Sequence, residues 1–215
     1  MISGAIFDAD GTLLDSMWIW SDIGIRYLES LNVKPEADFS KKLITMSLNQ
    51  SVDYIKYHYG VKQSSEKMIQ DISKLANDFY EYEVELKPGV VNTLQWLYQR
   101  DIPVTVATSS DKSYLIKAFK RLDILKYLKK IYTCVDYNTN KNLPYIYIKA
   151  SESFMCDKEN IYIFEDAYHA AKTAHEAGFR LVGIFDESAK ADTDKIKAIS
   201  DIYINNFTEL DMNLL

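Results

Sequence analysis

The segment AIFDADGTLLDS, residues 5–16, places two carboxylates one position apart directly after an apolar run. If the strand continued through them, Asp8 and Asp10 would project to one side and Ala9 to the other. Two carboxylates about 4 Å apart repel by roughly 4 kcal/mol at an effective dielectric of about 20. A turn at the end of the strand would explain the presence of Gly11, but it would not explain why two carboxylates are placed close together. The pattern predicts a cation or a shared proton, with one carboxylate attacking an electrophile and the other moving protons.

Three further polar runs follow predicted strands. Each has a simple structural reading: Ser110 could cap a helix, Lys141 could be a surface charge, and acids at a helix start complement its dipole. A phosphate ester suits the carboxylate pair of residues 5–16, because its leaving group needs a proton and its negative charge needs a cation. The runs are Thr108-Ser109-Ser110, Lys141 in NKNLPYIY, and Glu165-Asp166.

The elements that would position these residues alternate between strand and helix. The predicted strands are 5–7, 103–108, 131–135, 161–165 and 180–185. Two helices are predicted at 89–100 and at 167–177, the second ended by Gly178. Two more are predicted, one carrying Leu115, Phe119 and Leu122 and one with Pro144 at its first position. This alternation predicts an α/β fold with a doubly wound parallel sheet. In such sheets ligands bind outside the carboxyl ends of the strands, where the polar runs fall.

Residues 16–84 show helical spacing instead. The apolar stripes are Met17, Trp20, Ile23, Tyr27 and Leu31; then Val52, Ile55 and Tyr59 after a predicted N-cap at Asn49; then Met68, Ile72, Leu75, Phe79 and Tyr82. About four helices are predicted. We therefore expect a core domain of residues 1–15 and 85–215, interrupted by an all-α cap domain of residues 16–84.

Composition excludes several classes of protein. The 215 residues carry a net charge of −6 with a pI near 5.2, which disfavours binding to nucleic acid or to an anionic membrane. Cys134 and Cys156 lack the spacing of a zinc site or a disulfide framework, and no signal peptide or membrane span is recognisable. A cytoplasmic location is expected. The three histidines have no paired spacing and receive no role.

Asp8-Ala9-Asp10-Gly11-Thr12 after an apolar strand resembles the signature of the haloacid dehalogenase superfamily, and its flanks resemble the branch that contains phosphoglycolate phosphatase and β-phosphoglucomutase. The resemblance implies a Rossmann-like core with a helical cap and Mg²⁺ as the cofactor. It implies catalytic roles for Asp8 and Asp10, phosphate binding by Thr108, Ser109 and Lys141, and metal binding by Asp8, Asp10 (through its backbone carbonyl), Glu165 and Asp166. Asn142 and Tyr145 depart from the family pattern, in which Pro and Asp are usual.

The expected function is hydrolysis of a small phosphorylated metabolite through an aspartyl-phosphate. A sugar phosphomutase is the alternative, but its cap Arg and its His are replaced by Leu48 and Trp20. A catalytically idle binding protein on the same fold also stays open. Asp10 disfavours a true dehalogenase, and the length and the spacing of the acids disfavour a phospho-accepting receiver domain. The sequence does not specify the substrate or the oligomeric state.

Overall fold

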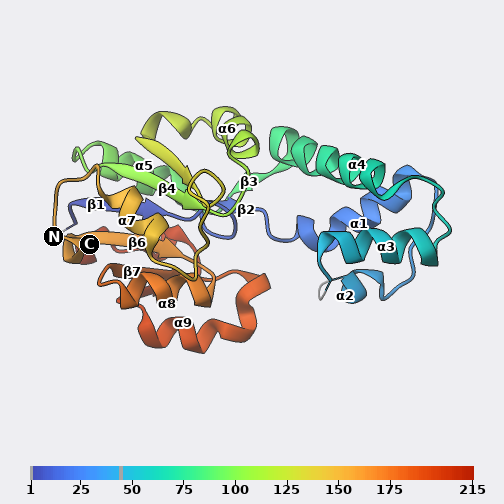
Figure 1. Cartoon of the computed structure of the whole chain (residues 1–215). Helices are drawn as coiled ribbons and strands as arrows, with labels where there is room; N and C mark the ends of the chain where they lie inside the picture. Colours follow the sequence, from blue (N-terminus) through green and yellow to red (C-terminus); the bar gives the residue numbers. More distant parts are fainter. Residues whose placement is uncertain (1, 44–45) are drawn as a thin grey trace. The chain divides into compact units, whose positions relative to one another are not determined.

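The computed structural model describes residues 2–43 and 46–215 (Figure 1). The chain forms two compact units. One unit holds the chain through Ser16 together with Val84–Leu215, and the other is Met17–Glu83. Each is described by itself below. The functional division into core and cap stays a prediction.

The first unit is built on a six-stranded parallel sheet, with strand order β5-β4-β1-β6-β7-β8. Its strands are β1 Gly4–Phe7, β4 Val104–Thr108, β5 Lys130–Thr133, β6 Ile161–Glu165, β7 Arg180–Ile184 and β8 Ile202–Ile204. The predicted doubly wound α/β architecture is confirmed. β8 was not predicted from the sequence.

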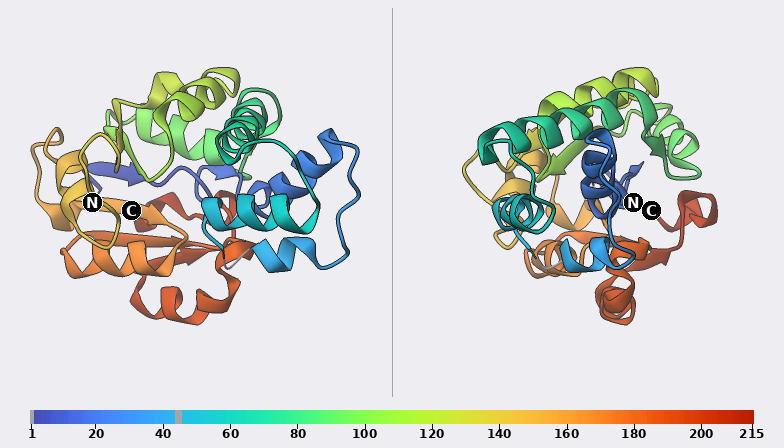
Figure 2. Two further views of the ribbon diagram at one scale, coloured as in Figure 1. Left: turned by 45° about the vertical axis from the view of Figure 1, so that its right-hand side comes forward. Right: turned by 90° about the vertical axis from the view of Figure 1, so that its right-hand side faces the viewer.

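Helices lie on both sides of this sheet (Figures 1 and 2). They are α5 Val90–Tyr98, α6 Lys112–Arg121, α7 Tyr145–Ser151, α8 Tyr168–Glu176 and α9 Thr193–Ile199, with short 3₁₀ turns at Leu125–Tyr127, Lys158–Asn160, Glu187–Asp192, Phe207–Glu209 and Met212–Leu214. α9 was not predicted. A short antiparallel ribbon of β2 Leu14–Asp15 and β3 Glu85–Leu86 was not predicted either.

The side chains of β1 and β6 alternate between the two faces of the sheet. Ile6 pairs in register with Ile163, and both belong to a core cluster with α7 and α8 residues such as Ile146 and Ala174. Phe7 pairs with Phe164 on the opposite face, and their rings stack at 4.1 Å. Both strands are therefore buried on both faces, as expected for the centre of a parallel sheet.

Two helix starts differ from the predictions. Asp111, rather than Ser110, caps α6, because its carboxylate accepts a hydrogen bond from the Ser113 N–H. Pro144 lies just before α7 instead of at its first position. Gly178 does follow the end of α8, with the positive φ of 87° that a glycine adopts without strain.

The second unit is helical, as predicted. It contains α1 Ile19–Ser30, α2 Phe39–Leu43, α3 Leu48–His58, α4 Ser65–Asp78 and a π-helical turn η1 Phe79–Glu83. Within this unit α1 packs against α2 and α4, and α3 packs against α4. Ser47 caps α3 in a reciprocal capping box with Gln50, so the predicted cap at Asn49 is wrong by two residues.

The predicted apolar stripes are correct only in part. On α1 the buried residues are Ile19, Ile23, Gly24, Tyr27 and Leu28, whereas Trp18 and Trp20 are almost half exposed. Ala76 is buried on α4, and Tyr82 of the stripe that begins at Met68 is 67% exposed. The π-helical turn at Phe79–Glu83 explains the second error, because it shifts the helical phase after Asp78.

Across the part of the chain that the structure describes, no helix combines the length and the apolar character needed to cross a membrane. The cytoplasmic location stays a prediction. Cys134 is buried and Cys156 half-buried, and both are free thiols.

A buried ion pair joins the residue after β3 to the end of β7. Lys87 Nζ lies 2.7 Å from Asp186 Oδ2 and donates to the Phe185 carbonyl at 2.9 Å, and both charged side chains are more than nine-tenths buried. Removing one partner of such a pair strands the other charge away from water, which typically costs about 3–5 kcal/mol. The pair therefore stabilises the contact between the segment after β3 and the segment after β7 only while both charges are present.

We expect Lys87→Met to lower the free energy of unfolding by about 3 kcal/mol, because Asp186 is left buried without its cation. The double variant Lys87→Met/Asp186→Asn should lose less than the sum of the single changes. Urea unfolding followed by circular dichroism measures these losses. Lys190→Met, which breaks the exposed ion pair with Glu187, is the matched control and should change little. Equal effects of the two lysine changes would contradict the prediction.

Candidate active site

Three strands deliver the polar residues to one edge of the sheet. Asp8 follows β1 directly, Thr108 ends β4, and Glu165 ends β6 with Asp166 next in the chain. β1 lies between β4 and β6, and the chain winds outward from β1 in both directions, so this edge is the topological switch point of the sheet. Ligands of open α/β sheets bind at such a point.

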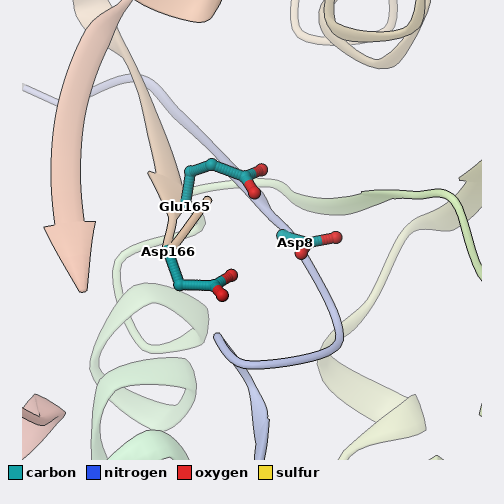
Figure 3. Close-up of side chains that lie close together, drawn as sticks. All are labelled: Asp8, Glu165 and Asp166. Atoms are coloured by element: carbon teal, nitrogen blue, oxygen red, sulfur yellow. The ribbon is translucent and has the colours of Figure 1, made fainter. Parts of the chain in front are cut away.

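The side chains of Glu165 and Asp166 point toward Asp8 (Figure 3). One carboxylate oxygen from each lies within 4.8 Å of the others, and all three residues are buried. Oxygen-only donors of this kind suit a hard divalent cation such as Mg²⁺. The predicted proximity of Asp8 to the acidic pair is therefore present, although residues 8 and 165 are far apart in the sequence.

Lys141 supplies the positive charge at this cluster. It lies in the loop between β5 and α7, is 5% exposed, and places Nζ 2.5 Å from Asp8 Oδ1 and 2.8 Å from Glu165 Oε2. Burial alone would lower the pKa of Lys141, but the carboxylates of Asp8 and Glu165 outweigh burial and hold this pKa above its ordinary value. Lys141 is therefore a charged ammonium, and the reading as a solvated surface charge is wrong.

One ammonium does not balance three carboxylates. Burial, followed by the negative charge of Glu165, raises the pKa of Asp8 well above its ordinary value despite Lys141. Burial and Glu165 likewise raise the pKa of Asp166 to about 8. Both shifts arise first from burial and then from the neighbouring negative charge of Glu165, and a bound divalent cation would favour the charged carboxylates.

Glu165 carries an oxygen without a donor. Its Oε2 accepts hydrogen bonds from Lys141 at 2.8 Å and from the Tyr147 hydroxyl at 3.1 Å. Within residues 2–43 and 46–215, no group donates to its buried Oε1. A buried polar atom left unsatisfied costs about 1–3 kcal/mol, so this oxygen fits a metal ligand. The donor set and this orphaned atom together fit the implied Mg²⁺.

The loop after β1 is shaped around Asp166. Thr12 Oγ1 donates to Asp166 Oδ1 at 3.0 Å. Gly11 has a φ of 81°, and a Cβ at this position would lie 2.4 Å from Asp166 Oδ2. Glycine is therefore required at position 11 both by its backbone conformation and by the space that Asp166 occupies.

Asp10 lies with Asp8 in the loop after β1, not in the strand itself. β1 ends at Phe7, and the loop that follows breaks the alternation of side chains. The Asp10 carboxylate instead accepts hydrogen bonds from Ser16 at Oδ1, at 2.6 Å, and from Ser110 at Oδ2. Both serine hydroxyls hold this side chain in one orientation, and metal binding through the Asp10 backbone carbonyl stays a prediction.

The two hydroxyl residues that end β4 differ in their surroundings. Thr108 is 1% exposed, and its Oγ1 accepts a hydrogen bond from the Ser110 N–H at 3.0 Å. The exposed Ser109 directs its hydroxyl toward Cys134 Sγ at 3.6 Å. Phosphate binding by Thr108, Ser109 and Lys141 stays a prediction.

No site role was predicted for Thr12, Ser16, Ser110 or Tyr147. Thr12 lies in the segment that carries the family resemblance, and Tyr147 ends the segment NKNLPYIY, so both positions were usable signals. Ser110 was read as a helix cap, which hid its contact with Asp10. Ser16 had no pattern to mark it, because its contact depends on how the loop folds back after β1.

Comparisons with known proteins find similarity along most of the chain. The chain is 22% identical over 184 residues to a phosphorylated carbohydrates phosphatase of Thermotoga maritima, covering 85% of each protein. It is 21% identical over 215 residues to hexitol phosphatase B of Escherichia coli, covering 97% of this chain and 94% of that one. The crystal structure of CbbY from Rhodobacter sphaeroides in complex with phosphate matches with a TM-score of 0.75 at 19% identity, over 100% of this chain and 99% of that one. The model of the haloacid dehalogenase-like hydrolases matches residues 5–184, and the chain belongs to this family.

Proposed function

We propose that this protein is a Mg²⁺-dependent phosphatase that hydrolyses a small phosphorylated metabolite through an aspartyl-phosphate at Asp8. The observation that carries the proposal is the buried cluster in which Asp8 lies 2.5 Å from Lys141 and beside Glu165 and Asp166. The curated relatives support a hydrolase of phosphate esters, because they are named as phosphatases of carbohydrate, glycerol and hexitol phosphates. The sheet unit is the proposed catalytic core and the helical unit the proposed cap.

The proposed binding roles follow from charge. Lys141 pairs with the substrate phosphate as well as with Asp8, and Thr108 and Ser109 donate to the phosphate oxygens. Asp8, the Asp10 carbonyl, Glu165 and Asp166 would hold Mg²⁺, which supplies positive charge that reduces the repulsion between the Asp8 carboxylate and the phosphate dianion.

The reaction proceeds in two displacements. An Asp8 carboxylate oxygen attacks phosphorus, the bond from phosphorus to the ester oxygen breaks, and Asp10 as the acid gives its proton to the leaving alkoxide. Asp10, now a carboxylate, takes a proton from a water molecule that attacks the aspartyl-phosphate. Inorganic phosphate leaves and both aspartates return to their starting forms. Ser16 and Ser110 position Asp10 by donating to its two oxygens.

A screen of phosphorylated metabolites, read as released phosphate with Mg²⁺, tests this function. We expect turnover of sugar or polyol monophosphates, and a parallel preparation of Asp8→Asn excludes a contaminating phosphatase. No release from any member of the panel by folded, Mg²⁺-loaded protein would contradict the proposal and favour an idle binding protein.

Incubation with β-glucose 1-phosphate and Mg²⁺ separates hydrolysis from isomerisation. A mutase must retain a substrate phosphate while the sugar reorients, but Leu48 and Trp20 are exposed apolar side chains at the positions of the mutase Arg and His. We expect phosphate release at least as fast as any formation of glucose 6-phosphate. Much faster formation of glucose 6-phosphate would identify a mutase instead.

A further inference from the structure

Tyr147 is a buried tyrosine on α7 with no role in the function proposed above. Its ring packs in the core cluster beneath the sheet, next to Ile146 and Ala150 of the same helix. Its hydroxyl reaches out of this apolar cluster and donates to Glu165 Oε2 at 3.1 Å. A phenylalanine ring would fill the same space, so packing does not explain the hydroxyl.

The hydroxyl is the second of two donors on one carboxylate oxygen. Lys141 comes from the loop before α7 and Tyr147 from the helix itself, and both donate to Oε2. Oε1 is therefore the oxygen left over, and it meets no donor among the described residues. Two donors on Oε2 hold that oxygen in place and leave Oε1 as the oxygen available to a metal.

Lys141 divides its donors between Glu165 and Asp8. Its ammonium is shared with Asp8 at 2.5 Å, and in the proposed function it also faces the substrate phosphate. Tyr147 is neutral, and its hydroxyl is directed at Glu165. It can hold Glu165 without drawing positive charge away from Asp8.

We propose that Tyr147 is a positioning residue that orients Glu165 so that its free Oε1 faces the metal. This inference rests on the proposed function, because it assigns Glu165 to a Mg²⁺ site. It predicts that the tyrosine hydroxyl affects Mg²⁺ affinity and acts only through Glu165.

Tyr147→Phe removes the hydroxyl and keeps the ring. We expect the dissociation constant for Mg²⁺, measured by isothermal titration calorimetry without substrate, to rise about tenfold, as is typical when a partner of a metal ligand is lost. The Mg²⁺ concentration for half-maximal hydrolysis of p-nitrophenyl phosphate should rise by a similar factor. Turnover at saturating Mg²⁺ should change much less.

Tyr145→Phe is the matched control, because Tyr145 lies on the same helix but is 43% exposed. It should bind Mg²⁺ like the wild type. Unchanged Mg²⁺ affinity of Tyr147→Phe, with or without a lower thermal midpoint in EDTA, would overturn the inference and leave the hydroxyl at most a structural hydrogen-bond donor.

A coupling measurement keeps the inference testable if Tyr147→Phe also loosens the fold. Glu165→Gln should weaken Mg²⁺ binding by itself, and adding Tyr147→Phe to it should have no further effect on Mg²⁺ affinity. Independent, multiplying effects of the two changes would overturn the inference. A wild-type protein that binds no Mg²⁺ or releases no phosphate would contradict the proposed function itself, and this outcome is distinct from the results above.

Discussion

Asp8→Asn should reduce phosphate release by at least about 10³-fold while the protein stays folded, because an amide is a far weaker nucleophile than a carboxylate. The expectation rests on the place of Asp8 at the end of β1, beside Lys141 and the acidic pair. The substitution keeps the size of the side chain and removes one buried negative charge. The rate of phosphate release at saturating substrate measures the loss, and the thermal midpoint shows that the fold is retained.

Asp101→Asn is the control for the same chemical change on the surface. Asp101 is exposed, and its positive φ of 56° is one that asparagine also adopts. This variant should retain wild-type turnover. If Asp8→Asn kept activity within tenfold of the wild type, Asp8 would not be the nucleophile. Mass spectrometry of protein quenched in acid during turnover tests the intermediate directly, since the wild type should gain one phosphoryl group.

Strand positions were predictable from the sequence because each central strand is a short apolar run bounded by polar residues. IYIFE at 161–165 coincides with β6, and the other predicted strands shift by one or two residues at their ends. β8 and the β2–β3 ribbon were missed. They are only two or three residues long, and their pairing depends on partners distant in the chain, which no local pattern records.

The identity of the charged residues was more predictable than their contacts. Asp8, Lys141, Glu165 and Asp166 meet because parallel strands bring their carboxyl ends to one edge. The orientation of Asp10 was not predictable in the same way. It follows from the loop geometry at Gly11 and from hydroxyl groups at Ser16 and Ser110, which lie 6 and 100 residues away.

Three local features of the sequence can be explained only from contacts that form on folding. Gly11 is required by the space that Asp166 fills, and that distance is visible only after folding. The apolar phase of α4 is lost at a π-helical turn, which has no simple spacing rule. The contact of Tyr147 with Glu165 likewise depends on where α7 packs against the sheet.

Removal of the metal should stop turnover. Asp8, Glu165 and Asp166 place three carboxylates around one ammonium, and a substrate phosphate adds further negative charge to the same buried space. Without a divalent cation, this repulsion opposes both binding and attack. We expect EDTA treatment followed by gel filtration to lower phosphate release by at least about 100-fold, since metal charge stabilisation is worth several kcal/mol, and we expect Mg²⁺ to restore it.

Substitution of one proposed ligand tests whether the effect of EDTA arises from this cluster. Asp166→Asn keeps the shape of the side chain but removes a negative charge, so Mg²⁺ should bind more weakly and restore less activity. Asp101→Asn should respond to EDTA and Mg²⁺ like the wild type. Full activity in excess EDTA, with no Mg²⁺ heat in calorimetry, would contradict the metal site. The carboxylates would then have to share protons, in line with the burial and the charge of Glu165 that raise the pKa of Asp166 to about 8.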